Sequence, residues 1–379
     1  MENCKNFKNK NSHTFFGYYD INPFSSDETK ILALSYQGII ESFSDPRKLD
    51  VGYFFLKDPE TFHKVGETTT WCWQQGARLR WFSEDPERLI IYNKMIDGVY
   101  GAVVQDICSK EIIKSYKRAF YDISSDGKYG LSLNFSRLQR LRQGYGYCNI
   151  TDETNGVLLP ENDGIIRIDM ATGEEKFLFS IKESAEFHQF ESMKIDAEHY
   201  FNHISFNPSG TRFLYFHIWM KHGKRLSRAV TVDLNGENMW AISNQGWVSH
   251  YDWKGDKNLL LYAFQREADK AFYEYEDLTD NRKQIGEGLL FRDGHPTYNI
   301  NKDDILVDAY SKDLKKQHLY LYNQKQSMVK LVHSSKTSLP DNREIRCDLH
   351  PRWSSSGKWI AIDTMENGKR VLSVLEMGA

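Results

Sequence analysis

The chain lacks the long apolar runs of a membrane protein, since no stretch of about 18 consecutive apolar residues occurs in it. Its first ten residues are polar, without the apolar centre of a signal peptide. Cysteine is scarce: five residues, an odd number with no C-x-x-C pair, indicate neither a disulfide framework nor a thiolate zinc site. We therefore expect a cytoplasmic protein in a reducing compartment, with no membrane insertion.

An excess of one charge is lacking as well. Lys and Arg number 49 against 52 Asp and Glu, which gives a formal net charge of -3. A protein that binds nucleic acid through its phosphates needs a dominant basic surface, so we expect no nucleic-acid partner. The sequence also has no GxSxG, P-loop, post-strand GxGxxG or HExxH motif. These absences disfavour several common hydrolase and nucleotide-binding classes.

Aromatic residues, by contrast, are abundant at 14% of the chain, which favours a large folded core built from β-strands. The stretch 346–363 contains a His, an aromatic residue three positions later, a Ser/Gly turn and a short apolar strand. Four copies begin with His and are spaced 47, 45 and 55 residues apart. They start at His203, His250, His295 and His350, and related copies without His start at Ile21, Arg78 and Phe120.

Seven units of this length are typical of a β-propeller. We predict an all-β fold, a seven-bladed propeller with four-stranded blades, as one domain over residues 1–379. Only 22 residues follow Gly357, enough for two strands, so N-terminal residues are expected to complete the last blade and close the ring. The 83 residues between positions 120 and 203 indicate an insertion in the third blade, at about 134–200.

The repeated His residues are candidates for chemistry, because the first strands of propeller blades face one central channel. We expect the imidazoles of His250, His295 and His350 to meet in one cluster, which suits a metal ion or proton transfer. Asp348 lies two residues before His350 and so on the same face of a strand. Together His295, His350 and Asp348 suit Mn²⁺ ahead of Zn²⁺ and Ca²⁺. The alternative is that these side chains only form hydrogen bonds at a repeated turn.

The predicted insertion carries an arginine run next to tyrosines. Arginine forks bind carboxylates and flat aromatic faces suit sugar rings, so these residues are candidate substrate contacts. They are Arg137, Arg140, Arg142, Tyr145 and Tyr147. A charge run of this kind is alternatively a solvated surface.

Two further sets of residues complete the candidates. Tyr121 and Arg137 are expected on neighbouring strands of one blade, as an acid or base beside a cation that neutralises a substrate carboxylate. Arg225 and Arg228 form a second basic pair after an apolar strand. Core packing for Tyr121, and plain surface charge for the basic pair, are the alternatives.

On the blade repeats and the Asp348-Leu349-His350-Pro351 stretch with Trp353, the chain resembles the propeller polysaccharide lyases, that is, oligogalacturonate lyases and propeller ulvan lyases. In the first group an HPHP-type motif binds Mn²⁺ together with a His of the preceding blade and a Gln. The resemblance implies His350 and His295 as ligands, with Asp348 in place of a motif His. This chain shows no clear equivalent of the Gln.

The resemblance also implies catalytic residues. His250, with Arg225 or Arg228, falls near the active-site His and Arg of the oligogalacturonate lyases. Tyr121 and Arg137 match the spacing of the catalytic Tyr and Arg of ulvan lyases, whose two further His are replaced here by Gln75 and Asn93.

The sequence thus leads to a lyase that cleaves an acidic, uronate-containing oligosaccharide or polysaccharide by β-elimination. In this hypothesis Arg137, alone or together with Arg225, neutralises the carboxylate, and Tyr121, His203 or His250 moves the protons. The alternative is a non-catalytic glycan-binding propeller of surface-polysaccharide synthesis, since the stretches 71–76 and 134–137 also resemble propellers associated with such gene clusters. A protein-interaction scaffold is a third reading.

Overall fold

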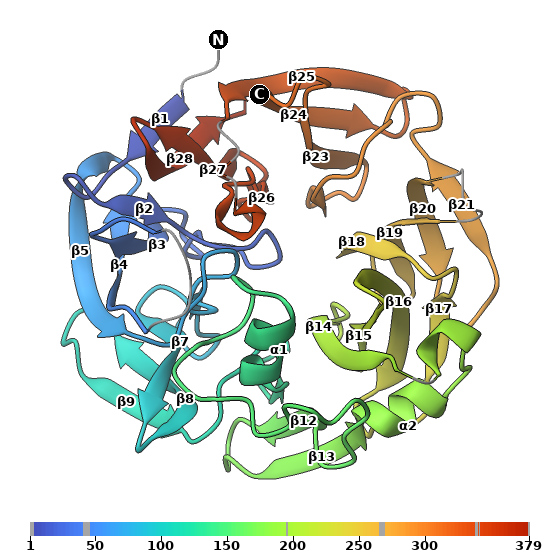
Figure 1. The fold of residues 1–379 in the computed structure, drawn as a ribbon. Helices are drawn as coiled ribbons and strands as arrows, with labels where there is room; N and C mark the ends of the chain where they lie inside the picture. The colour runs from blue at the N-terminus through green and yellow to red at the C-terminus, as the bar shows by residue number, and fades with distance from the viewer. Residues whose placement is uncertain are drawn as a thin grey trace. The chain divides into compact units, whose positions relative to one another are not determined.

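The computed structural model describes residues 4–40, 46–194, 196–264, 270–337, 340 and 342–377. In this part of the chain the structure is almost entirely β, with 28 strands and two short α-helices (Figure 1). The strands form five four-stranded sheets and one eight-stranded sheet, in which neighbours in sequence are nearly always neighbours in space. The predicted all-β fold with four-stranded units is confirmed. Residue 195, within the predicted insertion, lies outside the described residues.

The chain divides into two compact units. The first comprises Met1–Ala119, Gln143–Asn149 and Gly294–Ala379. Its N-terminal strands are β1 (Cys4–Phe7), β2 (His13–Phe15), β3 (Lys30–Tyr36), β4 (Leu49–Phe55), β5 (Asp58–Thr68), β6 (Arg80–Trp81), β7 (Leu89–Ile96), β8 (Val99–Asp106) and β9 (Ile112–Tyr116). Its C-terminal strands are β22 (Pro296–Tyr298), β23 (Asp304–Tyr310), β24 (Lys316–Asn323), β25 (Met328–Lys336), β26 (Arg352–Trp353), β27 (Trp359–Glu366) and β28 (Lys369–Glu376), with the 3-10 turn η2 (Arg343–Ile345) before β26.

The second unit comprises Phe120–Arg142 and Ile150–Asp293. Its strands are β10 (Asp122–Ile123), β11 (Tyr129–Ser132), β12 (Gly164–Asp169), β13 (Glu175–Ser180), β14 (Glu198–Phe206), β15 (Arg212–Lys221), β16 (Lys224–Asp233), β17 (Trp240–Ser243), β18 (Val248–Trp253), β19 (Asn258–Phe264), β20 (Lys270–Glu276) and β21 (Arg282–Ile285). Its helices are α1 (Phe135–Leu141), α2 (Ile181–Glu186) and the 3-10 turn η1 (Glu191–Met193).

Five of the seven copies of the repeat contain the same turn between two adjacent strands of a sheet. The fourth residue of the turn has a positive φ of 51–76° and donates its N–H to the carbonyl of the first residue at 2.8–3.0 Å. This left-handed position favours glycine and explains why glycine often closes the repeat. The turns are Ser25–Glu28, Ser124–Gly127, Asn207–Gly210, Asn299–Lys302 and Ser354–Gly357.

N-terminal residues pair with the last strand of the chain. β1 runs antiparallel to β28 from Cys4, opposite Leu375, to Phe7, opposite Leu372. β2 touches β28 in parallel at Thr14 and Val371. The eight-stranded sheet therefore joins both ends of the chain, and β28 does not remain an unpaired edge.

The extra residues after position 120 do not form one block. α1 and the loop that follows it precede β12, whereas α2 and η1 lie between β13 and β14. β12 and β13 are ordinary strands of the sheet β10–β13. The predicted insertion at 134–200 is therefore two segments that flank a normal hairpin.

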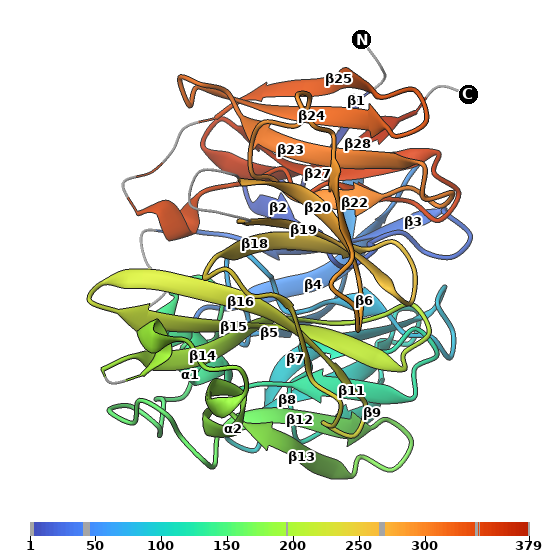
Figure 2. The same cartoon turned by 90° about the vertical axis from the view of Figure 1, so that its right-hand side faces the viewer.

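Within the first unit, the sheet of β22–β25 lies beside the strands β26–β28, with β22 packed against β26 and β25 against β27 (Figure 2). Leu306, Leu349 and Ile360 share the apolar cluster at this junction. The packing brings the segment before β22 next to the segment before β26. Both segments carry predicted site residues.

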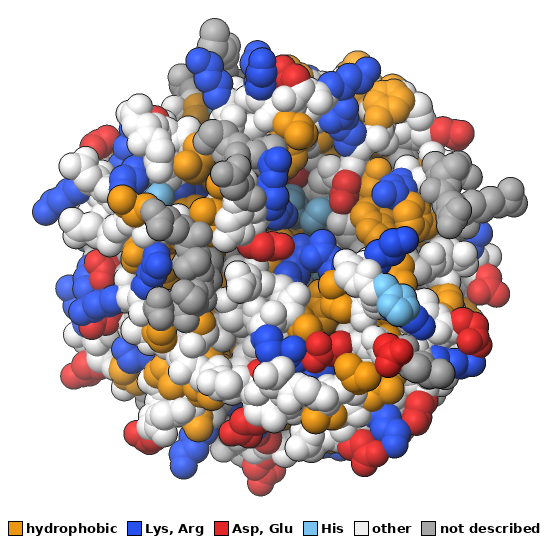
Figure 3. All heavy atoms as spheres, viewed as in Figure 1, with side chains coloured by type: hydrophobic (Ala, Val, Ile, Leu, Met, Phe, Trp, Pro, Cys, Tyr) orange, Lys and Arg blue, Asp and Glu red, His pale blue; other side chains and the backbone are white. Residues whose placement is uncertain are grey.

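Charges on the surface are mixed. On the face drawn in Figure 3, Lys and Arg side chains lie interspersed with Asp and Glu side chains, as a net charge of -3 leads one to expect. Among the described residues, no helix is long and apolar enough to cross a membrane.

Candidate functional site

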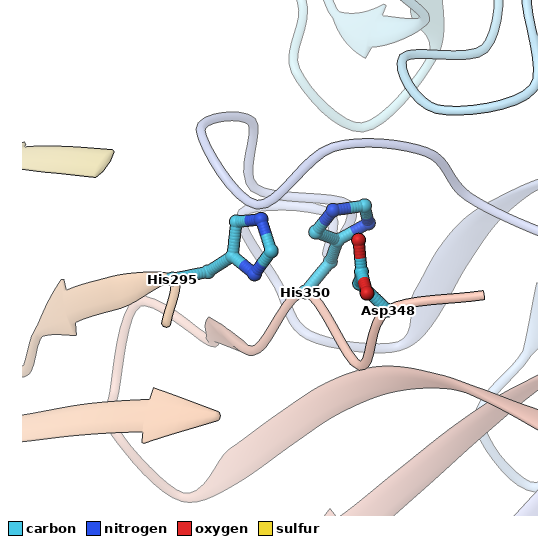
Figure 4. Close-up of side chains that lie close together, drawn as sticks. All are labelled: His295, Asp348 and His350. Carbon is cyan, nitrogen blue, oxygen red and sulfur yellow. The ribbon is translucent and has the colours of Figure 1, made fainter. Parts of the chain in front are cut away.

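Three predicted metal ligands come together in the first unit. One ligand atom each from His295, Asp348 and His350 lies within 4.8 Å of the other two (Figure 4). The two imidazole rings are 4.3 Å apart between centroids and nearly perpendicular, at 80°. All three side chains are buried. This spacing approaches that of ligands around one ion with bonds of about 2.0–2.3 Å.

His350 is the least satisfied member of this triad. Its side chain is fully buried, and neither ring nitrogen has a hydrogen-bond partner among the described residues. Its left-handed backbone, with φ of 46°, and the burial of Leu349 in the apolar cluster hold the ring in place. A buried polar group without a partner costs about 1–3 kcal/mol. The cost is offset if a bound cation takes a nitrogen of this ring.

The His350 ring is held neutral, the form that binds metals. Burial keeps its pKa well below the usual value, and the nearby positive charges of Arg370 and Arg352 act in the same direction.

Asp308 orients His295 and the backbone of both histidines. Its carboxylate accepts from Nδ1 of His295 at 2.9 and 3.0 Å. It also accepts the backbone N–H groups of His295 at 2.7 Å and His350 at 3.1 Å. The proton of the His295 ring is therefore assigned to Nδ1, which leaves the lone pair on Nε2, the orientation common among metal-binding histidines. The sequence signal was an acidic residue in the middle of the apolar strand β23, which the repeat analysis did not weigh.

Asp348 already forms an ion pair with a cationic side chain of the protein. Its carboxylate lies 2.9 Å from Nε of Arg346 and accepts from the Tyr310 hydroxyl at 2.5 Å. Burial and this carboxylate together raise the pKa of the Tyr310 phenol well above its usual value. Arg346 also donates to the hydroxyl of Tyr145 at 3.3 Å. Tyr145, predicted to face substrate, is instead 1% exposed.

Two neighbouring tyrosines pack against the histidines of the triad. The Tyr18 ring lies 4.7 Å from the His350 ring, and the Tyr19 ring lies 5.0 Å from the His295 ring. Both tyrosines are buried. They were missed because they belong to a connecting segment after β2, far from the motif in sequence.

His250, in the second unit, is oriented by a carboxylate of its own. Its Nδ1 lies 2.8 Å from Oδ1 of Asp293, and the imidazole is 15% exposed. A carboxylate on Nδ1 fixes the tautomer and makes Nε2 the basic atom. The pair suits a general base, rather than the third ligand that was predicted. Asp293 was not predicted, although only Gly294 separates it from His295.

Tyr121 and Arg137 do not lie on neighbouring strands as predicted, because Arg137 is in helix α1. Its guanidinium is 1% exposed and donates to the carbonyls of His199 and Thr154. The Tyr121 hydroxyl is buried, donates to Asn202 at 2.9 Å and accepts from the His203 backbone at 3.0 Å. Both side chains have partners within the second unit, so the predicted placement on neighbouring strands is wrong, and their contact with substrate stays a prediction.

The other candidates in the insertion also have internal partners. Arg140 pairs with Asp152 at 2.8 Å and Glu198 at 2.6 Å. Arg142 ends helix α1 and donates its backbone N–H to Leu138. The Arg140 guanidinium thus forms ion pairs within the second unit, and the substrate contacts predicted for this run stay a prediction.

Four further candidates are placed as follows. Arg228 is fully buried and donates to the carbonyls of Ser184 and His188, so it is no surface charge. Arg225, on β16, is exposed. Asn93 is buried and donates to the Tyr147 hydroxyl at 2.7 Å. Gln75 is buried in the first unit.

His203 has a left-handed backbone, like His350, with φ of 53°. Its ring packs edge-on against Phe216 at 5.1 Å and Tyr251 at 6.1 Å. Four histidines in equivalent sequence positions therefore have different surroundings, and only two of them join the triad.

A second histidine pair lies in the core of the second unit. His199 donates from Nε2 to the Met193 carbonyl at 3.0 Å, so its Nδ1 accepts from Nε2 of His217 at 2.8 Å. Nδ1 of His217 lies 3.0 Å from the Ser184 hydroxyl. Both rings are fully buried, and the chain of bonds is closed. This network is structural.

The network makes the protein sensitive to acid. Burial lowers the pKa of His199 to about 4 and that of His217 well below the usual value. The unfolded chain titrates these residues near pH ~6.5 and binds more protons below that pH, so their contribution is present above pH ~6.5 and lost as the pH falls. We expect about 1.4 kcal/mol lost per pH unit and histidine, measured as urea unfolding between pH 7.5 and 5. A His199→Gln/His217→Gln variant should show a shallower dependence; an equal slope would contradict this assignment.

No family model matches the chain, and no curated protein matches it. Solved structures do. An oligogalacturonate lyase from Vibrio parahaemolyticus is 13% identical, with a TM-score of 0.67 over 100% of this chain and 97% of the other. An oligogalacturonate lyase in complex with manganese is 14% identical, with a TM-score of 0.66 over 100% and 96%. A Kuenenia stuttgartiensis hydrazine synthase chain reaches 0.50 at 10% identity, over 98% and 99%. At such identities the likeness is one of fold.

Proposed function

We propose that this protein is a lyase that cleaves a uronate-containing oligosaccharide by β-elimination. The observation that carries the proposal is the buried triad His295, Asp348 and His350, with an unsatisfied His350 ring, in a chain that shares its fold over its full length with oligogalacturonate lyases. One of those structures contains manganese. The substrate class is inferred from the activity named for those lyases and from the chemistry below.

The fold proposed for this function is a single seven-bladed propeller. The four-stranded sheets supply five blades, and the eight-stranded sheet supplies two more, β26–β28 with β1, and β2–β5. The pairing of β1 with β28 supports a ring closed by N-terminal residues.

The triad fits a divalent cation. Two neutral imidazoles and a carboxylate are a donor set that suits Mn²⁺ or Zn²⁺, and Asp308 supplies the carboxylate that orients His295. His295 Nε2, His350 and Asp348 would hold the ion. When bound there, it would neutralise the carboxylate of a uronate and so acidify the proton on the adjacent carbon.

The protein's own residues then move the proton. From the chemistry of the pair alone, Nε2 of His250, oriented by Asp293, is assigned as the base that takes the proton from C5 of the sugar. The electron pair forms the C4–C5 double bond, and the C4–O4 bond breaks. The departing O4 receives the proton from the His250 imidazolium, so the cycle needs no water and no oxidant. Arg225, exposed on β16, is assigned to the substrate carboxylate.

The test is incubation of the purified protein and Mn²⁺ with a panel of uronate oligomers, followed by the ultraviolet absorbance of unsaturated products. We expect absorbance to rise with at least one member of the panel. A flat trace across all uronates, linkages and divalent cations would rule the lyase out.

A non-catalytic glycan-binding protein is the second candidate. It is favoured by the internal use of Tyr121, Arg137 and Asn93, three positions at which the ulvan lyase resemblance placed catalytic groups. It predicts glycan binding without turnover, and binding that is unchanged in His250→Ala.

Removal of Arg346 should strengthen metal binding. The guanidinium neutralises Asp348 in the metal-free protein and therefore competes with a cation for that carboxylate. We expect Arg346→Gln to raise the affinity for Mn²⁺ about tenfold in calorimetry. Tyr310→Phe, which removes the other partner of Asp348 but no charge, is the matched control and should change the affinity less. A weaker affinity in Arg346→Gln would contradict Asp348 as a ligand.

A further inference from the structure

The second unit contains an open pocket that shares no residue with the triad or with the His250–Asp293 pair. Its volume is about 270 Å³. It lies between the end of β17 and the turn that joins β20 to β21, with one wall from the segment after α2. It is lined by His188, residues 240–245, Tyr275, Thr279, Asp280 and Arg282.

Two buried polar atoms of residues that line this pocket have no hydrogen-bond partner among the described residues. The Ser243 hydroxyl is on a side chain that is only 3% exposed, and neither it nor the buried Oδ1 of Asn244 forms a hydrogen bond. Buried polar groups without partners are uncommon in folded proteins. They indicate a ligand or ordered water at this place.

Arg282 adds an uncommitted positive charge. It is exposed at the start of β21, and within the described chain no hydrogen bond or ion pair occupies its guanidinium. Other arginines of the second unit are committed, as Arg140 is to Asp152 and Arg212 to Asp277. A free planar fork is suited to a carboxylate, which it binds through two parallel hydrogen bonds.

Aromatic rings and a fixed rim complete the pocket. Trp240 is half-buried, and Tyr275 is buried directly across the β20–β21 hairpin from Arg282. The backbone of His188, on the rim, is fixed because buried Arg228 donates to its carbonyl at 3.0 Å. Aromatic faces beside polar side chains suit a sugar, which presents both flat apolar ring faces and hydroxyls.

We propose that this pocket binds one uronic acid residue of a glycan, as a site separate from the triad. Arg282 binds the carboxylate, the exposed carboxylate of Asp280 accepts from sugar hydroxyls, and Trp240 covers a face of the ring. A pocket near 270 Å³ is at the small end for ligand sites, which suits a single sugar. The choice of an acidic sugar rests on the proposed function.

The test uses full-length His350→Ala protein, so that binding at the triad is disabled. Calorimetric titration with a saturated uronate trisaccharide is compared with its neutral counterpart of the same linkage. We expect Arg282→Gln to weaken uronate binding at least tenfold and to leave neutral-sugar binding unchanged, with Arg282→Lys intermediate. Trp240→Ala should weaken both. Because Arg282 is exposed, its variants are expected to fold.

The outcomes separate the two proposals. Two results overturn the pocket, whether or not the protein cleaves uronates. One is the absence of uronate binding in the His350→Ala parent. The other is uronate binding by Arg282→Gln and Trp240→Ala that is as tight as that of this parent. Loss of uronate binding in both variants supports the pocket even where no unsaturated product forms. The absence of unsaturated product contradicts only the lyase.

Discussion

Replacing His350 with alanine is expected to lower the affinity for Mn²⁺ by more than about 100-fold and to abolish product formation. Mutation of a residue that merely orients a metal ligand costs about 10- to 100-fold in affinity, so loss of a ligand exceeds this. The fully buried ring has no hydrogen-bond partner in the described structure. Its removal therefore breaks no hydrogen bond within the fold. Calorimetry and the electron paramagnetic resonance of bound Mn²⁺ measure the effect.

Two variants accompany this measurement. Asp308→Asn should cost about 10- to 100-fold in affinity, because it weakens the orientation of His295. His318→Gln, a histidine on β24 of the same unit outside the triad, should bind Mn²⁺ as the parent does. Equal Mn²⁺ binding by His350→Ala and the parent would show that the triad is no metal site.

Replacing His250 with alanine is expected to lower kcat by about 10²- to 10⁴-fold, the usual contribution of a general acid or base. Substrate affinity should stay within a few-fold of the parent, because the imidazole acts on the proton and not on the carboxylate. Initial rates with the best uronate of the panel, together with calorimetric binding, separate the two effects.

The partner of His250 gives the sharper comparison. Asp293→Asn keeps the shape of the pair but no longer favours the imidazolium that forms during proton transfer. We expect a smaller kcat in Asp293→Asn than in the parent, with little change in substrate affinity. Full activity in both His250→Ala and Asp293→Asn would remove this pair from the reaction.

The fold was largely predictable because its repeat rests on local turn chemistry. A Ser or Asn begins the turn and a left-handed residue closes it, as at Ser354 and Gly357, and apolar strands such as β27 follow. The helix α1 was missed although Asn134 caps it and Phe135, Leu138 and Leu141 recur at helical spacing. That pattern was interpreted only as a charge run.

The site was predictable in part. His295, Asp348 and His350 follow from the alignment of repeats, because equivalent strand starts lie at one end of neighbouring sheets. The internal position of Arg137 was not predicted, because its partners are backbone carbonyls of a distant loop, which no side-chain pattern reveals. Arg346 and Asp308 were missed for the related reason that their role depends on which neighbour each one faces.

Mass spectrometry of the products tests the central claim most directly. A β-elimination splits a uronate oligomer without adding water, so the masses of the two fragments must sum to that of the substrate, with one fragment unsaturated. We predict this result for the parent protein with Mn²⁺ and its absence in His350→Ala. Fragments whose masses sum to the substrate plus one water, or an intact substrate after prolonged incubation, would contradict the lyase.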